Sequence, residues 1–314
     1  MLPYIDGFLL NLQANNYSPY TVCNYERDLE VFNHFLNESN IQFDKVNKQT
    51  ITYYKAYLAS RGPKAGKPSN HGDKQLGPRT INYKLTALRV YLRYLIDMDY
   101  PCPLPPEAVK LTKAAQKHPQ VAELNDLVRL IEAPAPESNI IGLRDKVILE
   151  TLFSTGLRVS ELVSLDRDQV DLGRQEFGIK GKGNRVRVCF LPDTAAQWIT
   201  RYLQSRRDHF KPLFIRYSGA IATGKNGEKM RLTARSIQKV VTKYAKRCGL
   251  PVKASPSTLR HGFATYLAEE GANPPAIQVL LGHESLDTTT RYIHASDRYA
   301  EETQHKYHPL AEID

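Results

Sequence analysis

The sequence predicts a mainly α-helical protein: a helical N-terminal domain, then a mixed, mostly helical second domain with a small antiparallel sheet. Apolar residues recur at helical spacing through the first hundred residues. A proline-dense basic run then breaks this pattern. Beyond it, helical stripes alternate with two short strand-like segments around a glycine-rich turn. With 314 residues, the chain is long enough for each domain to bury its own core.

Three helices are expected in the first domain. Ser18 followed by Pro19 indicates a helix cap and a first-turn proline, and the Gly77-Pro78 pair marks the start of a later helix. The three apolar stripes are Val22, Tyr25, Leu29, Phe32 and Leu36; Ile51, Tyr54 and Leu58; and Ile81, Leu85, Leu88, Leu92 and Leu95. The segment between the second and third helices, residues 62–77, is rich in Gly, Lys and Pro and is expected to be a surface loop.

Four cations of the third helix lie off its apolar stripe: Arg79, Lys84, Arg89 and Arg93. Such a helix can pack inward and still offer cations to phosphates. A solvated charged face is the more common role for any one of these side chains.

The domain boundary is expected near residue 118. Residues 101–118 contain Pro101, Pro103, Pro105 and Pro106 and several lysines, the composition of an extended linker. We therefore expect a first domain over 1–100, a linker over 101–118 and a second domain over 119–314. In the second domain, helical stripes cover 123–132 and 140–154, and further helices are expected near residues 193, 233, 258 and 275. Two strands, 175–180 and 185–190, flank the turn 181–184.

The charge favours an anionic partner. The chain has 43 Lys and Arg against 33 Asp and Glu, a net charge of +10 and a pI near 9.3. Up to His118 there are 15 basic and 10 acidic residues, and 28 and 23 beyond it, so each half carries +5. Nucleic acid is the commonest such partner, although on charge alone a merely soluble basic protein is equally compatible.

Other classes of protein are disfavoured. The four cysteines are too far apart for a zinc site or a disulfide framework, which favours a reducing cytosol. No run approaches 18 apolar residues, and the N-terminus lacks the pattern of a signal peptide, so neither a membrane protein nor a secreted one is expected.

Four segments carry the chemistry. They are Thr155–Leu162 (TGLRVSEL), the turn Gly181–Asn184 (GKGN), Leu259–Thr265 (LRHGFAT), and Leu281-Gly282-His283 followed nine residues later by Tyr292. In this order and at these separations they resemble the segments of tyrosine recombinases, the phage integrase superfamily, and most closely the Xer-type site-specific recombinases. The resemblance covers nearly the whole chain. It implies that the first domain is a core-binding domain for DNA and the second a catalytic domain.

Breaking a DNA strand without hydrolysis needs a nucleophile that attacks phosphorus, cations that hold the phosphate charge, and an acid that protonates the leaving oxygen. Arg158 and Arg260 are the candidate cations, because an arginine can hold two phosphate oxygens at once. Gly156 is suited to end the helix before Arg158. An ordinary surface arginine is the alternative for either residue taken alone.

Tyr292 is the candidate nucleophile, since among the 18 tyrosines only it lies nine residues after the Leu-Gly-His segment. The resemblance implies that Lys182, at the hairpin tip, protonates the leaving 5′-oxygen. It also implies that His283 donates a hydrogen bond to the phosphoryl group. Alternatives for the lysine are Lys180, Arg185 and Arg187, and the competing tyrosines are Tyr299 and Tyr307.

One position departs from the family pattern. Three residues before Arg260 the family usually has histidine, whereas this chain has Ser257. Because Ser257 follows Pro256 just before an apolar helical run, a helix N-cap is the favoured interpretation. A serine hydroxyl could instead contact a phosphate oxygen. His261 could also substitute for the histidine, although it resembles a structural residue of the family.

The resemblance implies a site-specific recombinase that needs no cofactor and no metal. Tyr292 would form a 3′-phosphotyrosyl link, and strands would be exchanged through a Holliday junction. The expected partners are a double-stranded DNA recombination site and three further recombinase protomers, in a homo- or hetero-tetramer on two sites. A helix within residues 298–310 would dock on a neighbouring protomer. The expected location is the cytoplasm, at the nucleoid, with no membrane partner.

Several roles remain open. The chain starts directly at the core-binding domain, which favours Xer-like resolution of chromosome or plasmid dimers. An integrase or excisionase of a mobile element is the main alternative, and residues 216–230 form a segment longer than the compact Xer pattern. A type IB topoisomerase would use the same pocket. A noncatalytic DNA-binding relative is suggested only by Ser257.

Overall fold

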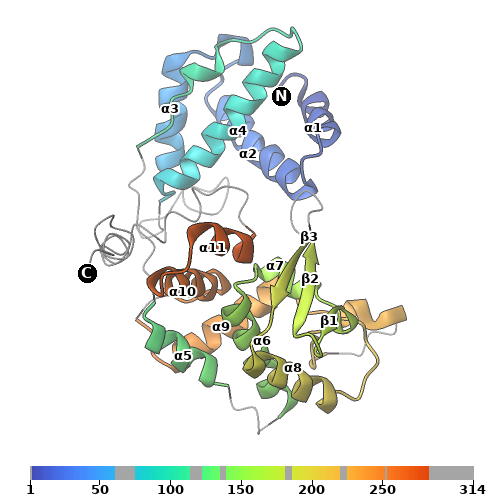
Figure 1. The fold of residues 1–314 in the computed structure, drawn as a ribbon. Coiled ribbons are helices and arrows are strands. Elements are labelled where there is room, and N and C mark those ends of the chain that lie inside the picture. Colours follow the sequence, from blue (N-terminus) through green and yellow to red (C-terminus); the bar gives the residue numbers. More distant parts are fainter. Residues whose placement is uncertain are drawn as a thin grey trace, which may run out of the picture. The chain divides into compact units, whose positions relative to one another are not determined.

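The computed structural model describes residues 2–60, 75–113, 122–134, 139–180, 186–219, 225–251 and 253–282. The chain divides into two compact units, Met1–His118 and Pro119–Asp314. The described residues form eleven α-helices and one three-stranded antiparallel sheet (Figure 1). The predicted fold class, mainly α with a small antiparallel sheet in the second part, is confirmed.

The first unit is helical. Its α-helices are α1 (Ile5–Ala14), α2 (Pro19–Glu38), α3 (Lys48–Ala59) and α4 (Pro78–Asp97), with short 3₁₀ turns η1 (Phe43–Lys45) and η2 (Pro106–Ala108). Helix α2 packs against α1, α3 and α4. As predicted, α2 begins after Ser18, whose hydroxyl oxygen accepts the backbone N–H of Thr21, and Pro19 occupies its first turn.

The core of this unit is apolar and aromatic. Phe8, Phe32, Tyr54 and Tyr91 are fully buried and pack edge to face or tilted against one another and their neighbours. The three predicted stripes face this core, except that Tyr25 is half-buried. Burial of these side chains therefore holds the four helices together.

Residues 101–113 are packed against the first unit, although the sequence predicted a linker from residue 101. Leu104 and Val109 are buried in the core of this unit. The Asn82 side-chain amide donates to the Thr112 carbonyl at 2.9 Å, and its oxygen accepts the Thr112 N–H at 2.8 Å. Proline stops a helix here, but it does not stop apolar side chains from packing.

The second unit is built around α6 (Ile140–Thr155), which contacts α5, α8, α9 and α10 and is buried on nearly all sides. The other helices are α5 (Leu124–Glu132), α7 (Val159–Ser164), α8 (Asp193–Ser205), α9 (Ala234–Arg247), α10 (Pro256–Glu269) and α11 (Pro274–Leu281), with 3₁₀ turns η3 (Arg167–Gln169) and η5 (Lys225–Met230). The predicted helices 123–132 and 140–154 are confirmed to within a residue.

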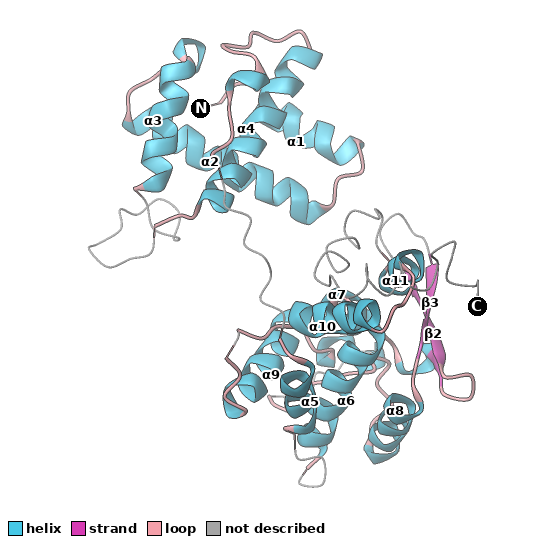
Figure 2. Ribbon diagram, turned by 60° about the vertical axis from the view of Figure 1, so that its left-hand side comes forward, coloured by secondary structure: helices cyan, strands magenta, loops and turns pink. Residues whose placement is uncertain are grey.

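The sheet has the order β1 (Val170–Asp171), β2 (Glu176–Lys180), β3 (Val186–Phe190), and both pairs are antiparallel. Figure 2 shows β2 and β3 as neighbouring magenta strands. Both predicted strands are confirmed to within a residue. Phe177 pairs with Cys189 and Ile179 pairs with Arg187, so these four side chains share the face that is turned to the core. Strand β3 also contacts α11, which brings the sheet beside the C-terminal end of that helix.

Candidate active site

The candidate site lies at two helix ends, each of which is formed by a glycine in the left-handed backbone conformation. Gly156 ends α6 with φ 60°, and Gly282 ends α11 with φ 64°. Glycine adopts this conformation without a steric penalty, which explains both residue types. The reversal at Gly156 puts Arg158 immediately before α7, as the sequence predicted. Helix α10, which carries Arg260, contacts both α6 and α11.

Arg158 reaches from the start of α7 to the end of α11. Its Nη1 donates to Glu161 Oε1 at 2.9 Å, and its Nη2 donates to the Gly282 carbonyl at 2.9 Å. The side chain is 43% exposed. Its other guanidinium N–H groups have no partner among the described residues, so Arg158 can still bind an anion.

Arg260 lies deeper, with 7% of its surface exposed. Its Nη1 donates to the Gly156 carbonyl at 2.7 Å, and its Nη2 donates to the Leu281 carbonyl at 2.8 Å. Arg158 and Arg260 therefore bond to the carbonyls of two consecutive residues, Leu281 and Gly282. The structure brings together these two predicted site residues, which are 102 positions apart in the chain.

Two further charged residues complete this cluster, and the sequence had not assigned either as a site residue. Glu161 is 7% exposed and accepts the Arg158 backbone N–H at 2.8 Å through Oε2. Arg187 of β3 binds the same carboxylate in a bidentate manner, at 2.9 and 3.1 Å. Glu161 lies one helical turn after Arg158, a spacing that could have pointed to it. Arg187 had been considered only as an alternative to Lys182.

The carboxylate of Glu161 is held ionised. Burial would raise the pKa of Glu161, but hydrogen bonds from Arg187 and then Arg158 outweigh it and lower the pKa below the ordinary value. The pKa of Arg187 is raised, because the bonds to Glu161 outweigh the opposing effect of burial. The cluster therefore consists of three cations (Arg158, Arg187 and Arg260) and one anion.

Ser257 is not the N-cap of α10, so that prediction is wrong. The cap is Ser255, whose hydroxyl oxygen accepts the Thr258 N–H at 3.3 Å, while the Thr258 hydroxyl accepts the Ser255 N–H at 3.0 Å. The helix begins earlier than expected, because Pro256 is well suited to its first position. Ser257 is exposed in the first turn, and its hydroxyl has no hydrogen-bond partner among the described residues. It lies one turn before Arg260 on the same helix, where it could contact an anion.

The remaining predicted site residues, Lys182, His283 and Tyr292, lie outside the described residues, as does the segment 298–310. His283 directly follows Gly282, whose carbonyl Arg158 holds. The strands on either side of the turn that carries Lys182 are described, and Arg187 lies in the second of them.

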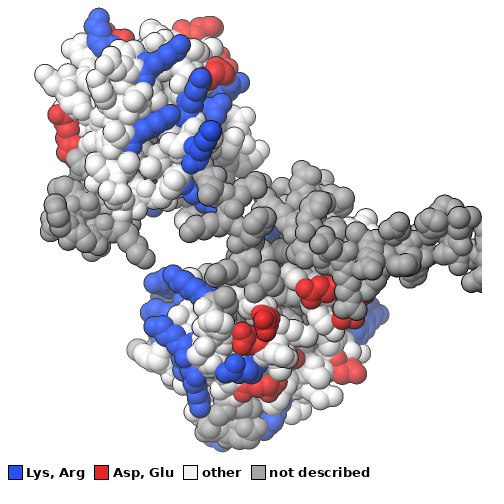
Figure 3. Space-filling view, turned by 90° about the vertical axis from the view of Figure 1, so that its left-hand side faces the viewer, with Lys and Arg blue, Asp and Glu red and all other residues white. Residues whose placement is uncertain are grey.

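The four candidate DNA-binding cations of α4 differ in their surroundings. Lys84 Nζ contacts Asp28 Oδ1 of α2 at 2.7 Å, and the two side chains are only 11% and 12% exposed. Arg93 pairs with Glu107 on the surface at 2.5 Å, Arg79 is exposed and Arg89 is half-buried. Lys84 is therefore a structural residue, whereas the arginines remain accessible. Figure 3 shows Lys and Arg side chains gathered on one face of this unit.

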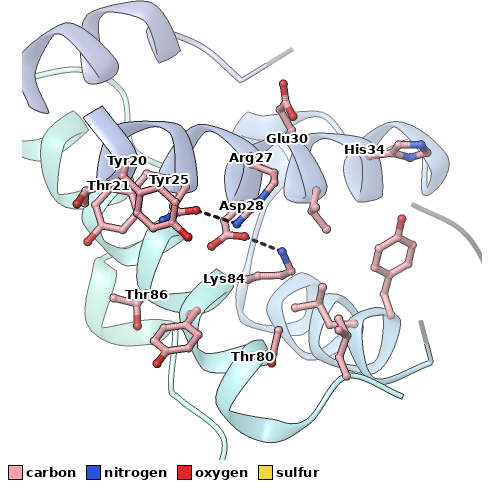
Figure 4. A pocket seen from close by; sticks show the side chains of 16 residues that line it. Tyr20, Thr21, Tyr25, Arg27, Asp28, Glu30, His34, Thr80, Lys84 and Thr86 are labelled. Carbon is pink, nitrogen blue, oxygen red and sulfur yellow. Dashed lines mark hydrogen bonds and ion pairs between the residues drawn. The ribbon is translucent and has the colours of Figure 1, made fainter. Parts of the chain in front are cut away.

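A groove lies beside the Lys84 ion pair, between α2 and α4 (Figure 4). Its volume is about 1130 Å³, and its lining includes exposed aromatic and hydroxyl side chains such as Tyr20, Tyr83 and Thr80. Figure 4 shows Lys84 directed toward Asp28. The groove is lined by residues of the first unit, whereas the arginine cluster belongs to the second unit.

Within the described ranges, no three His, Cys, Asp or Glu side chains are grouped as a metal site would require. Across the same ranges, none of the helices has the length and apolar character needed to span a bilayer.

Comparison with known proteins identifies the family. The phage integrase family pattern matches residues 120–298, and the N-terminal SAM-like domain of phage integrases matches residues 5–98. A tyrosine recombinase XerC of Pelobacter propionicus is 34% identical over 316 residues, covering 99% of this chain and 97% of the relative. A tyrosine recombinase XerD of Staphylococcus epidermidis is 28% identical over 292 residues, covering 93% of each.

Solved structures share the fold. A XerH site-specific recombinase bound to palindromic difH substrate in a post-cleavage complex has a TM-score of 0.70 at 20% identity, covering 93% of this chain and 81% of that chain. A Tn1549 transposon integrase in complex with transposon right end DNA has a TM-score of 0.70 at 18% identity, covering 97% and 99%. The sequence matches show that the chain belongs to the phage integrase family and is a DNA strand-transferring enzyme.

Proposed function

We propose that this protein is a site-specific tyrosine recombinase of the Xer type, which cuts and rejoins DNA with Tyr292 as its nucleophile. The observation that carries the proposal is the convergence of Arg158 and Arg260 on the carbonyls of Leu281 and Gly282. The chain runs from there to His283 at once and to Tyr292 ten residues after Gly282. The two arginines of the family pattern thus lie where the chain enters the segment that carries His283 and Tyr292.

The arginines would bind the scissile phosphate. Arg158 has an exposed side chain with N–H donors that no other described residue accepts, and a guanidinium can hold two phosphate oxygens in a fixed geometry. Arg260 is fixed by two backbone carbonyls, so its charge is held in place before DNA arrives. Cations positioned in advance stabilise the additional negative charge that develops in the transition state.

The chemical step would exchange one phosphodiester bond for another. The Tyr292 oxygen attacks phosphorus, its bond to phosphorus forms, and the bond to the 5′-oxygen of the DNA breaks. Lys182 protonates that oxygen, and His283 donates to the phosphoryl group. A free phenol has a pKa of about 10, so nearby cations would favour the ionised nucleophile. The 5′-hydroxyl of a partner strand then displaces Tyr292, which conserves the bond energy.

Four protomers on two DNA sites would exchange strands in pairs through a Holliday junction. Both units would bind the DNA, the first as the predicted core-binding domain and the second as the catalytic domain. A helix within 298–310 would dock on the next protomer. Relatives named tyrosine recombinase XerC and XerD support a Xer-type enzyme, for which the sequence resemblance implies resolution of chromosome or plasmid dimers rather than integration of a mobile element.

The nucleophile is tested on a nicked suicide duplex that carries the recognition site. Tyr292→Phe should abolish the covalent protein–DNA band on a denaturing gel and leave DNA affinity nearly unchanged, because only the attacking oxygen is removed. Tyr299→Phe is the matched control and should retain the band. A band that survives Tyr292→Phe, or one lost in Tyr299→Phe instead, would contradict the assignment.

A further inference from the structure

Glu161 presents a difficulty for phosphate binding at Arg158. A carboxylate that is almost fully buried lies 2.9 Å from the guanidinium that the proposed function assigns to the scissile phosphate. A bound carboxylate competes with a phosphate for the same cation, and Arg158 with Glu161 alone would form a neutral pair. The site therefore needs another charge to offset Glu161.

Arg187 supplies that charge. It binds both oxygens of Glu161, and its side chain is only 12% exposed. Oε1 accepts Nη1 of Arg158 and Nη1 of Arg187, while Oε2 accepts Nη2 of Arg187 and the backbone N–H of Arg158. The side chains of Arg158, Arg187 and Glu161 together carry one net positive charge. Of the two guanidinium groups, only that of Arg158 is exposed.

Arg187 also fits closely against the end of α11. A Cβ atom on Gly282 would lie 2.7 Å from Nη1 of Arg187 and 3.0 Å from its Cδ. The carbonyl of that same glycine accepts from Arg158. Arg187 therefore ties β3, α7 and the end of α11 at one point, and it follows Lys182 by five residues in the sequence.

We propose that Arg187 is a positioning residue which neutralises Glu161 and so keeps the charge of Arg158 available for a phosphate. Glu161 then orients Arg158 without cancelling its charge. This inference rests on the proposed recombinase function for its biological meaning. Its physical content, the binding of a phosphate oxyanion at Arg158, can be measured without catalysis.

The first measurement is single-turnover cleavage of the suicide duplex at saturating protein, well below the melting temperature. Arg187→Gln should slow cleavage about 10- to 100-fold, because Glu161 then pairs with Arg158 alone; this is the size of effect seen when a residue that orients a metal ligand is removed. The double variant Glu161→Gln/Arg187→Gln should recover most of this loss, since the amide oxygen still accepts from Arg158 without opposing its charge. Arg187→Lys should be intermediate, because lysine lacks the bidentate fork.

The matched control is Arg174→Gln. Arg174 is an exposed arginine beside the same sheet, and among the described residues its guanidinium contacts Asp171 alone, at 4.0 Å. Its replacement should leave cleavage unchanged. If Arg187 merely supported the fold, the double variant would be no faster than Arg187→Gln and would be at least as unstable.

The second measurement needs no DNA. Inorganic phosphate, compared with chloride at equal ionic strength, should raise the melting temperature of the wild type. Arg158→Gln should abolish this shift, Arg187→Gln should reduce it, and the double variant should restore it. If the variants show these phosphate-induced shifts but the wild type forms no covalent complex with DNA, the recombinase proposal is rejected and the role of Arg187 stands. Three results would overturn the inference. Arg187→Gln could cleave DNA and respond to phosphate as the wild type does, or the double variant could fail to recover cleavage. The third is a wild type that neither cleaves DNA nor gains stability from phosphate.

Discussion

The two units bury different kinds of residue. Of the eleven buried polar or charged residues within the described ranges, only Thr50 belongs to the first unit. The second unit buries the other ten, and Arg144, Arg206 and Arg260 are among them. The first unit is held together by apolar and aromatic contacts, whereas the second also contains an interior network of charges.

The interior arginines of the second unit bond to backbone carbonyls of irregular segments. Arg206 donates to the carbonyls of Phe210, Pro212 and Leu213, and Arg144 donates to that of Ile215. Buried carbonyls outside helices and strands need such donors. Arg260 does the same at the C-terminal ends of α6 and α11, where the carbonyls of Gly156 and Leu281 have no partner within the helix. The candidate site therefore uses the same kind of bond as Arg144 and Arg206, whereas in the first unit neutral side chains serve such carbonyls: Asn82 donates to Thr112 and Tyr91 donates to Pro3.

The largest effect is expected for Arg206→Met, which tests whether buried charges stabilise the second unit. The Arg206 side chain is fully buried and also pairs with Asp208, so its loss leaves several carbonyls and a carboxylate without their donor. We expect a loss of about 3–5 kcal/mol in unfolding free energy. The single tryptophan, Trp198 in α8, reports on this unit alone in denaturant titrations followed by fluorescence. A loss below about 1 kcal/mol would mean that the charged interior is not what stabilises these loops.

The corresponding change in the first unit is Lys84→Met. It breaks one ion pair with Asp28 and frees no backbone carbonyl. We expect a smaller loss, about 1.5–3 kcal/mol, as for a hydrogen bond to a charged group. Near-ultraviolet circular dichroism of the tyrosine-rich first unit measures it. A loss equal to that of Arg206→Met would remove the proposed difference between the units.

Helix capping should give a still smaller effect. Ser255→Ala removes the acceptor of the Thr258 N–H and should cost about 1 kcal/mol. Ser257→Ala is the matched control and should change stability by less than about 0.5 kcal/mol, because Ser257 is exposed. Thermal unfolding of the two variants compares them directly. Equal losses of stability in the two variants would contradict Ser255 as the N-cap of α10.

The smallest expected effect is a pH dependence of the Glu161 contribution. Its folded pKa is lowered below the ordinary value, so the stability it provides is fully present above the unfolded pKa of about 4.3 and is lost as pH falls through the folded pKa. The difference in melting temperature between wild type and Glu161→Gln should therefore stay constant from about pH 7 to pH 5 and shrink at lower pH. A difference that already changes near neutrality would contradict an ionised, paired Glu161.

Local patterns in the sequence determined the elements. The stripes of the first unit, the two strands and the glycines at the ends of α6 and α11 were all predictable, because helix period, strand alternation and left-handed caps depend on neighbouring residues. The same logic could have assigned Ser255 as a cap, since Ser255-Pro256 repeats the Ser18-Pro19 pattern at the start of α2. The family, and with it the candidate roles of Arg158 and Arg260, also followed from the sequence.

The tertiary structure alone decided which charges meet. Lys84 and Arg79 look alike in the sequence, but Lys84 meets Asp28, 56 residues away, while Arg79 faces solvent. The composition of residues 101–113 predicts a linker, but in the structure Leu104 and Val109 pack into the apolar core of the first unit. Glu161 became the shared partner of Arg158 and Arg187 only when α7 and β3 packed together. Whether a charge is paired depends on side chains brought close by packing of distant segments, and no local pattern records that proximity.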